Sequence, residues 1–372
     1  MLRVKNAGTQ PFKTMQVFNN WDVVAKAWYI AIPSGRLRVG KARSMDLCGQ
    51  WVVLFRGMDG RVRALDGFCP HMGTDLGIGR VVGDEIRCFF HHWRFDGEGR
   101  CIHVPCQPEI PFAARLQSYA VEEKYGFIWV YPDRLAPTSV VVHSELEGED
   151  LVWVHGRPYE RSCHHHVTMI NGIDPQHLRT VHGIEISMEM DLRENEHEGL
   201  FDITLTGELP ASRSVERLAR WLLGARYSYK MRYASASIGC LTILKGVSWF
   251  GSGRSLPELY MIFAYRPLAP GRTLVQPIYL ARRRPGVLGW LTSLLLIWLT
   301  QRALIALRGE DGMVYENMRF QPGALIPIDA PVAKFIAHVN RLEISMWSRN
   351  RGATQTGQRP SGVESAQQGK SV

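Results

Sequence analysis

Two short segments, Cys69-Pro70-His71 and Cys88-Phe89-Phe90-His91, decide how this sequence folds. Each segment supplies one cysteine and one histidine, and sixteen residues separate the two pairs. Thiolates and imidazoles bind zinc and iron–sulfur clusters, but zinc fingers usually begin with two cysteines roughly two to four residues apart. The mixed pairs therefore favour an iron–sulfur cluster. Zinc, and simple burial of the cysteines, are the alternatives.

Short apolar runs separated by turn residues surround these segments. Turns such as Asp59-Gly60 alternate with runs rich in Trp, Val, Ile and Phe, which is typical of strands in a small all-β domain. We expect this domain to occupy residues 21–135, after an N-terminal arm at residues 1–20. The expected strands cover residues 28–32, 51–55, 62–65, 86–90 and 125–131.

The remainder of the chain, residues 136–350, mixes strand-like and helix-like segments. Because these segments lack regular βαβ alternation, they favour an α+β domain. A tail rich in Gly, Ser, Gln and Thr follows at residues 351–372, and we expect it to be disordered. The expected strands are 241–244 and 259–265, and the expected helices are 166–181, 213–223, 287–308 and 331–347.

Asp174, His177 and His182 form a second pattern of metal ligands. Two histidines and one carboxylate on one side of a metal are typical of non-haem Fe(II) oxygenases, because open positions remain for O2. Positions five apart on a helix diverge by about 140°, so His182 lies either on a widened helix or past its end. Pro175 fits the first turn of a helix that Asp174 caps, which is the structural alternative for that carboxylate.

Together these motifs resemble the Rieske non-haem iron oxygenases over residues 20–345. The resemblance implies an all-β Rieske [2Fe–2S] domain, followed by a helix-grip catalytic domain with a large antiparallel sheet. It implies that the cluster is held by Cys69, His71, Cys88 and His91. It also implies that a mononuclear Fe(II) is held by His177, His182 and a third, carboxylate ligand.

Two carboxylates take roles from the same resemblance. The segment from Glu310 to Asn317 resembles the part of the family in which an aspartate precedes an aromatic residue, Glu and Asn. Asp311 is therefore the expected third iron ligand, with Glu310, Glu316 and a solvated acidic helix face as alternatives. Asp174 is expected to pass electrons from the cluster of a neighbouring subunit, within a ring-shaped homotrimer.

The resemblance implies an oxidoreductase that consumes O2 and receives electrons from a ferredoxin or flavin reductase. NAD(P)H belongs on that partner, because no Gly-x-Gly-x-x-Gly fingerprint follows a strand here. The cluster segments are similar to arylamine N-oxygenases of antibiotic biosynthesis, which suggests a small aromatic substrate. The Asp311 segment is more similar to sterol-oxidising members, such as cholesterol 7-desaturases. A Rieske electron carrier is the alternative of another class, but it leaves the second motif unexplained.

One position departs from the family pattern. Rieske oxygenases usually have glycine where His92 stands. The Cys-x-x-His spacing still selects His91 as the ligand, and His92 is expected to be a surface or packing residue.

Charge and cysteine content limit the remaining function classes. The formal charge of +9 is scattered and accompanies no nucleic-acid recognition motif, although it suits an acidic electron-transfer partner. Seven cysteines without a secretory signal favour a reducing, cytoplasmic setting. The uncharged run at 286–300 is shorter than the ~20 residues of a spanning helix. We expect a buried helix there, with membrane contact through residues 286–308 as the alternative.

Overall fold

The structure is a computed structural model that describes residues 17–141, 143–181, 187–208, 217, 226–245 and 257–350. Most of the expected N-terminal arm and the expected tail lie outside the described residues. So do His182 and, apart from residue 217, the expected helix at 213–223. The seven cysteines all lie in the described part of the chain, and no disulfide joins them.

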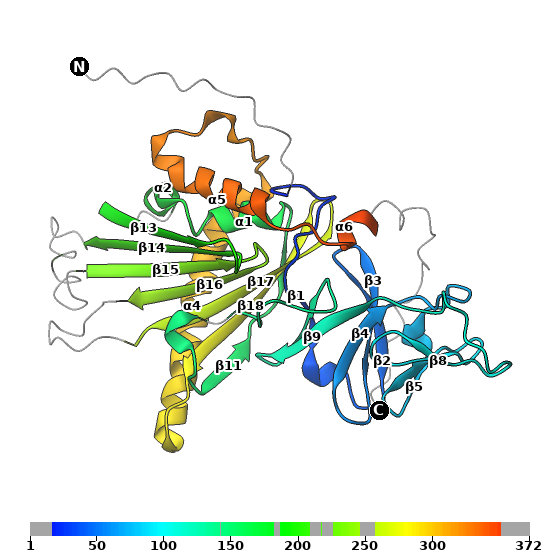
Figure 1. Cartoon of the computed structure of the whole chain (residues 1–372). Helices are drawn as coiled ribbons and strands as arrows, with labels where there is room; N and C mark the ends of the chain where they lie inside the picture. Colours follow the sequence, from blue (N-terminus) through cyan, green and yellow to red (C-terminus); the bar gives the residue numbers. More distant parts are fainter. Residues whose placement is uncertain are drawn as a thin grey trace.

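The first unit consists of two antiparallel sheets, shown in blue to cyan in Figure 1. The strands are apolar where they face the core; all five residues of β10 are buried. The six-stranded sheet has the order β1 (Tyr29–Pro33), β10 (Phe127–Tyr131), β9 (Ser118–Lys124), β4 (Val62–Asp66), β3 (Gln50–Arg56) and β2 (Ala42–Leu47). The four-stranded sheet has the order β5 (Arg80–Val82), β6 (Glu85–Arg87), β7 (Arg94–Phe95) and β8 (Cys101–His103).

The second unit is built on an eight-stranded antiparallel sheet, which confirms the predicted fold class. In Figure 1 this sheet (green to yellow) stands beside the first unit. Its order is β11 (Leu151–His155), β18 (Arg272–Arg282), β17 (Leu259–Ala269), β16 (Ile238–Lys245), β15 (Arg226–Ala234), β14 (Leu200–Glu208) and β13 (Ser187–Asn195), and β12 (Tyr159–Arg161) also pairs with β18.

Helices cover this sheet and carry the residues of the second motif. The longest, α4 (Gly286–Glu316), packs against β18, β17, β11 and β12. None of the helices among the described residues is long and apolar enough to cross a membrane. The shorter helices are α1 (His165–Ile170), α2 (Pro175–Thr180), α5 (Ala330–Arg341) and α6 (Trp347–Asn350).

Four predicted elements differ from the structure. The expected helix at 166–181 is two helices, because the Asp174 side chain caps a new start at Pro175 by accepting from the Gln176 amide. The expected strand at 86–90 ends at Arg87, where the chain turns. The expected helix at 331–347 ends at Arg341 and α6 begins at Trp347, whereas α4 runs eight residues past the predicted end at 308.

A shared hydrophobic core joins the two units. Trp129 on β10 belongs to the same buried cluster as Ile262 on β17 and Ile278 on β18. Near the C-terminal end of the described chain, Trp347 is fully buried in the core of the six-stranded sheet, with its ring beside those of Tyr29 and Tyr119. The two sheets are therefore held in a fixed arrangement.

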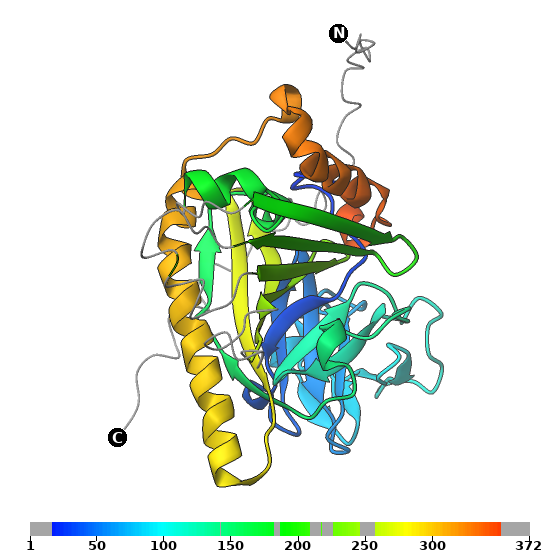
Figure 2. The same cartoon turned by 90° about the vertical axis from the view of Figure 1, so that its left-hand side faces the viewer.

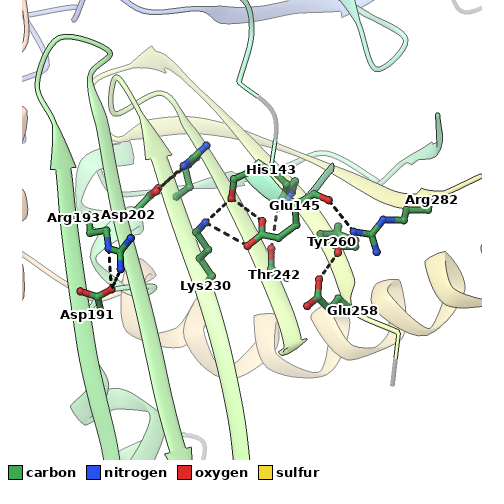
Figure 3. A network of polar contacts seen from close by, with 12 residues as sticks. His143, Glu145, Asp191, Arg193, Asp202, Lys230, Thr242, Glu258, Tyr260 and Arg282 are labelled. Atoms are coloured by element: carbon green, nitrogen blue, oxygen red, sulfur yellow. Dashed lines mark hydrogen bonds and ion pairs between the residues drawn. The ribbon is translucent and has the colours of Figure 1, made fainter. Parts of the chain in front are cut away.

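A polar network fixes the connection between the units to the eight-stranded sheet, as Figure 3 shows. Lys230 on β15 donates to the Ser144 hydroxyl at 2.6 Å and lies 3.3 Å from the Glu145 carboxylate. Nδ1 of His143 lies 3.1 Å from Oγ1 of Thr242 on β16. The His143 ring is buried, and this burial lowers its pKa to about 4.

We expect acid to destabilise the protein through His143. Its folded pKa of about 4 lies below the ordinary 6.5, so between these values the unfolded chain binds a proton that the folded chain does not. The free energy of unfolding therefore falls as pH falls, by about 2 kcal/mol between pH 7 and pH 5. Urea titrations at both pH values should show that His143→Gln loses this part of the pH dependence. An unchanged dependence would contradict the assignment.

Candidate metal sites

The first candidate site is formed by two turns of the first unit. In one turn the Cys69 amide donates to the Thr74 carbonyl at 2.8 Å, and the Gly73 amide donates back to the Cys69 carbonyl at 2.8 Å. In the other, the Cys88 amide donates to the Trp93 carbonyl at 2.9 Å. These bonds close both turns locally, so each cysteine is fixed by its own neighbours in sequence.

The two turns bring the cysteine thiols together. Both residues are buried, and a hydrogen bond from the Cys69 thiol lowers the pKa of the Cys88 thiol to about 5. The same bond, together with burial, raises the pKa of Cys69. Two neighbouring buried thiols, one of them with a lowered pKa, are suited to bind a metal as thiolates.

The histidines of the two turns also meet. The ring centroids of His71 and His91 are 4.5 Å apart, and Trp93 stacks on His71 at 4.3 Å. Nδ1 of His71 is buried and has no hydrogen-bond partner. Buried polar atoms are nearly always satisfied, and a metal bond would satisfy this one. The four predicted residues therefore fit a cluster with two thiolate and two imidazole ligands.

His92 lies outside this arrangement, as the spacing predicts. The residue is exposed, and its backbone adopts φ 59°, in the left-handed region. Glycine reaches this region without a steric penalty, whereas other residues pay roughly 1 kcal/mol or more. The turn itself therefore explains why glycine is usual at this position.

The second candidate site is a cavity of about 190 Å³ between α1, α2, α4 and α5. Asp174, His177 and Asp311 all line it, so the structure brings three predicted residues from two distant segments to one place. The rest of the wall is mainly apolar; it includes Val167, Ile170, Val314, Met318, Phe320, Leu325 and Val332. His182 lies outside the described residues, although its neighbour Val181 lines the cavity.

The start of α2 orients His177. Its Nδ1 hydrogen-bonds to the backbone carbonyl of Asp174. A carbonyl can only accept, so Nδ1 carries the proton and Nε2 remains as the ligand atom. Metal-binding histidines commonly have such a backbone partner. The Asp174 carboxylate accepts from the Gln176 amide at 2.8 Å, so this residue is a helix cap and also lines the cavity.

The structure distinguishes between two of the candidate carboxylates on α4. Asp311 lines the cavity, whereas Glu316 is exposed and lies 4.0 Å from the Arg161 guanidinium. The Glu310 side chain is not among those the structure describes. Of these two carboxylates, Asp311 is therefore the one that lies at the same cavity as His177.

Sequence reasoning missed two polar residues of the cavity wall. Tyr315 is buried, and burial together with the nearby Asp311 charge raises its pKa well above the ordinary value. Its position four residues after Asp311 could have revealed it, because such residues share one helix face. Asp329 accepts from the Gln176 side chain at 2.6 Å and ties α2 to the segment before α5. No local pattern marks Asp329.

Three buried imidazoles, His164, His165 and His166, lie at the start of α1 with ring nitrogens within 4.8 Å of one another. Nδ1 of His164 caps the helix by accepting from the His166 amide at 3.2 Å. Nδ1 of His166 accepts from the Asn19 amide, also at 3.2 Å, and its ring stacks with Phe18. These contacts join the N-terminal segment to α1.

Comparison with known proteins identifies the first unit. Residues 27–120 match the family model of the Rieske [2Fe-2S] domain. The chain is 32% identical over 174 residues to aminopyrrolnitrin oxygenase PrnD of Pseudomonas fluorescens, covering 44% of this chain and 47% of that protein. It is 26% identical over 335 residues to cholesterol 7-desaturase nvd 1 of Ciona intestinalis, covering 84% and 67%. The chain thus spans about half of the length of the PrnD protein that it matches.

The fold is similar to that of dicamba monooxygenase bound to dicamba, with a TM-score of 0.62 and 19% identity, covering 88% of this chain and 98% of that one. The protein is therefore a Rieske [2Fe–2S] domain joined to a second, mainly antiparallel domain. Its relatives and its fold are those of the Rieske non-haem iron oxygenases, so the resemblance drawn from the motifs is confirmed.

We expect His92→Gly to stabilise the protein by up to about 1 kcal/mol, because glycine relieves the left-handed strain at a small entropic cost. His103→Gly is the matched control, since His103 is exposed on β8 with ordinary backbone angles, and it should destabilise. Urea unfolding gives both values. The visible and EPR signals of the cluster should persist in His92→Gly; their loss would identify His92 as a ligand.

Proposed function

We propose that this protein is the oxygenase component of a Rieske-type system, which uses O2 and electrons from a separate ferredoxin and reductase to oxidise a small aromatic compound. The observation that carries the proposal is the meeting of Asp311 and His177 at one cavity, in a chain whose first unit pairs two cysteines with two histidines. An electron carrier has no need of the second site.

In this proposal Cys69, His71, Cys88 and His91 hold the [2Fe–2S] cluster, and His177, His182 and Asp311 hold the iron. The cluster supplies single electrons and the iron supplies O2 activation. The protein's own part is positional. The Asp174 carbonyl fixes the tautomer of His177, and the apolar wall keeps water from the reacting centre. Tyr315 stays protonated beside Asp311.

The size of the cavity favours a small substrate. Cavities of about 150 Å³ hold a benzene molecule, and this one is about 190 Å³ with a mainly apolar wall. A single substituted aromatic ring fits such a space. We therefore propose an arylamine, as in the relative named aminopyrrolnitrin oxygenase, in a pathway of secondary metabolism such as antibiotic biosynthesis. The sterol-desaturase relatives make a sterol the second candidate.

Electron delivery to Asp174 is proposed to come from the cluster of a neighbouring subunit in a homotrimer. Exposed apolar side chains surround the cluster turns, and such patches mark protein contacts. These side chains are Phe68, Met72, Phe89 and Phe90. The net formal charge of +9 on the chain suits an acidic ferredoxin.

Iron content tests the proposed ligands. Wild-type protein should hold about three irons per chain, two in the cluster and one at the second site. Asp311→Ala should keep the Rieske EPR signal but lose the third iron, with turnover falling about 100-fold or more. Glu316→Gln is the matched control on the same helix and should keep all three. Equal iron content in Asp311→Ala and wild type would refute the assignment of Asp311.

Product analysis tests the substrate class. Purified protein supplied with ferredoxin, reductase and NAD(P)H should add oxygen to the nitrogen of an arylamine, as detected by mass spectrometry. A parallel sterol panel is the comparison. A sterol that loses two hydrogens or gains one oxygen, with the arylamines unchanged, would replace the small-aromatic proposal by the sterol one. Silence from both panels in protein with full iron content would refute the proposed substrates.

A further inference from the structure

The first half of α4 exposes a continuous apolar surface. Leu288 is 80% exposed and Val287 is 74% exposed, although both are large apolar residues on a regular helix. Figures 1 and 2 show these first turns (yellow) on the outer side of the molecule, where they project below the eight-stranded sheet. Over residues 287–305 the exposed apolar side chains that the structure describes are Val287, Leu288, Trp290, Leu291, Leu295, Trp298, Leu299 and Ile305.

The first half of α4 lacks the usual division into an apolar inner face and a polar outer face. Its buried side carries two hydroxyl residues, Ser293 and Thr300, on either side of Ile297. The Ser293 hydroxyl donates to the Arg282 carbonyl at 2.8 Å, and the Thr300 hydroxyl donates to the Leu296 carbonyl at 2.8 Å. Polar groups thus face the sheet while leucines and tryptophans face outward. A helix that is apolar all round is normally buried in protein or in lipid.

Cations lie at both ends of the apolar surface. Arg284 is exposed immediately before the helix, and the backbone around it packs closely against Gly289. Arg302 is exposed further along, with its guanidinium 5.2 Å from the ring of Trp298. Arg282 donates to the Glu145 carbonyl, as Figure 3 shows, and Arg283 pairs with Asp150.

We propose that the first half of α4 binds the surface of an anionic lipid bilayer, with residues 287–305 lying in the headgroup region. At 1.5 Å per residue this stretch is about 27 Å long. Tryptophan and arginine are suited to this region, because their apolar parts enter the acyl boundary while their polar ends reach water and phosphate. A helix that lies on the membrane need not span it.

The charges favour a bilayer over a second copy of this chain. Two copies of α4 packed face to face would each bring Arg284 and Arg302 to the contact, and like charges at an interface oppose association. Phosphate headgroups complement the same charges. This inference concerns location and goes beyond the proposed reaction, so its test needs no turnover.

Vesicle binding tests the proposal. Full-length protein is sedimented with vesicles of phosphatidylcholine, with and without phosphatidylglycerol. Wild type should bind the anionic vesicles and show a blue shift of tryptophan emission, and high salt should weaken binding. Leu288→Glu combined with Leu295→Glu should reduce the bound fraction about tenfold or more. Leu135→Glu is the matched control, because Leu135 is equally exposed but lies far from α4 in sequence, and it should bind as wild type.

Arg284→Glu combined with Arg302→Glu should lower binding to anionic vesicles and leave binding to neutral vesicles unchanged. The visible spectrum of the cluster and circular dichroism show whether each variant is folded. The proposal fails if folded wild type ignores anionic vesicles, or if the leucine variants bind them as wild type does. It also fails if the leucine variants alter the oligomer mass measured by light scattering and leave vesicle binding unchanged. The exposed surface of α4 would then be a subunit interface.

Discussion

The hydrophobic contact between the six-stranded and the eight-stranded sheet is the interaction on which both candidate sites depend. Trp129 and Ile262 lie in one buried cluster, so the sheets cannot move apart without exposing that core. Arg266 strengthens the contact, because its buried guanidinium donates to the carbonyls of Ile30 and Ala31 at 3.2 and 3.0 Å. Burial lowers the Arg266 pKa, and these carbonyls compensate part of the cost.

Rigid joining of the units has a consequence for electron transfer. The cluster turns lie on the first unit, and the cavity lies among the helices of the second unit. Because a buried core joins the two units, the two sites keep a fixed separation within one chain. If electrons reach the cavity from a neighbouring subunit, as proposed, exposed apolar residues such as Phe89 and Phe90 are suited to that contact. The proposed trimer meets that requirement with identical subunits.

Local spacing explains how much the sequence predicted. Cys69 with His71, and Cys88 with His91, lie on short turns closed by bonds to near neighbours, so the order of residues largely determines their geometry. The segment pattern favoured Asp311 over Glu316, and of these two it is Asp311 that lines the cavity. The single helix expected at 166–181 was wrong, because apolar periodicity does not show where a helix is interrupted, but the helix start at Pro175 with Asp174 as its cap was anticipated and is confirmed. Asp329 was missed because its contact with Gln176 spans 153 residues.

The helix α4 also shows why a pattern can be read two ways. Its uncharged run is compatible with a buried helix and with an exposed one, because hydrophobicity alone does not say what covers the helix. The structure separates the cases: Ile297 is buried against the sheet while Leu288 is not. The same helix carries Asp311 about 35 Å further along, at 1.5 Å per residue. Whatever holds its first turns therefore also constrains the orientation of the part of the helix that lines the cavity.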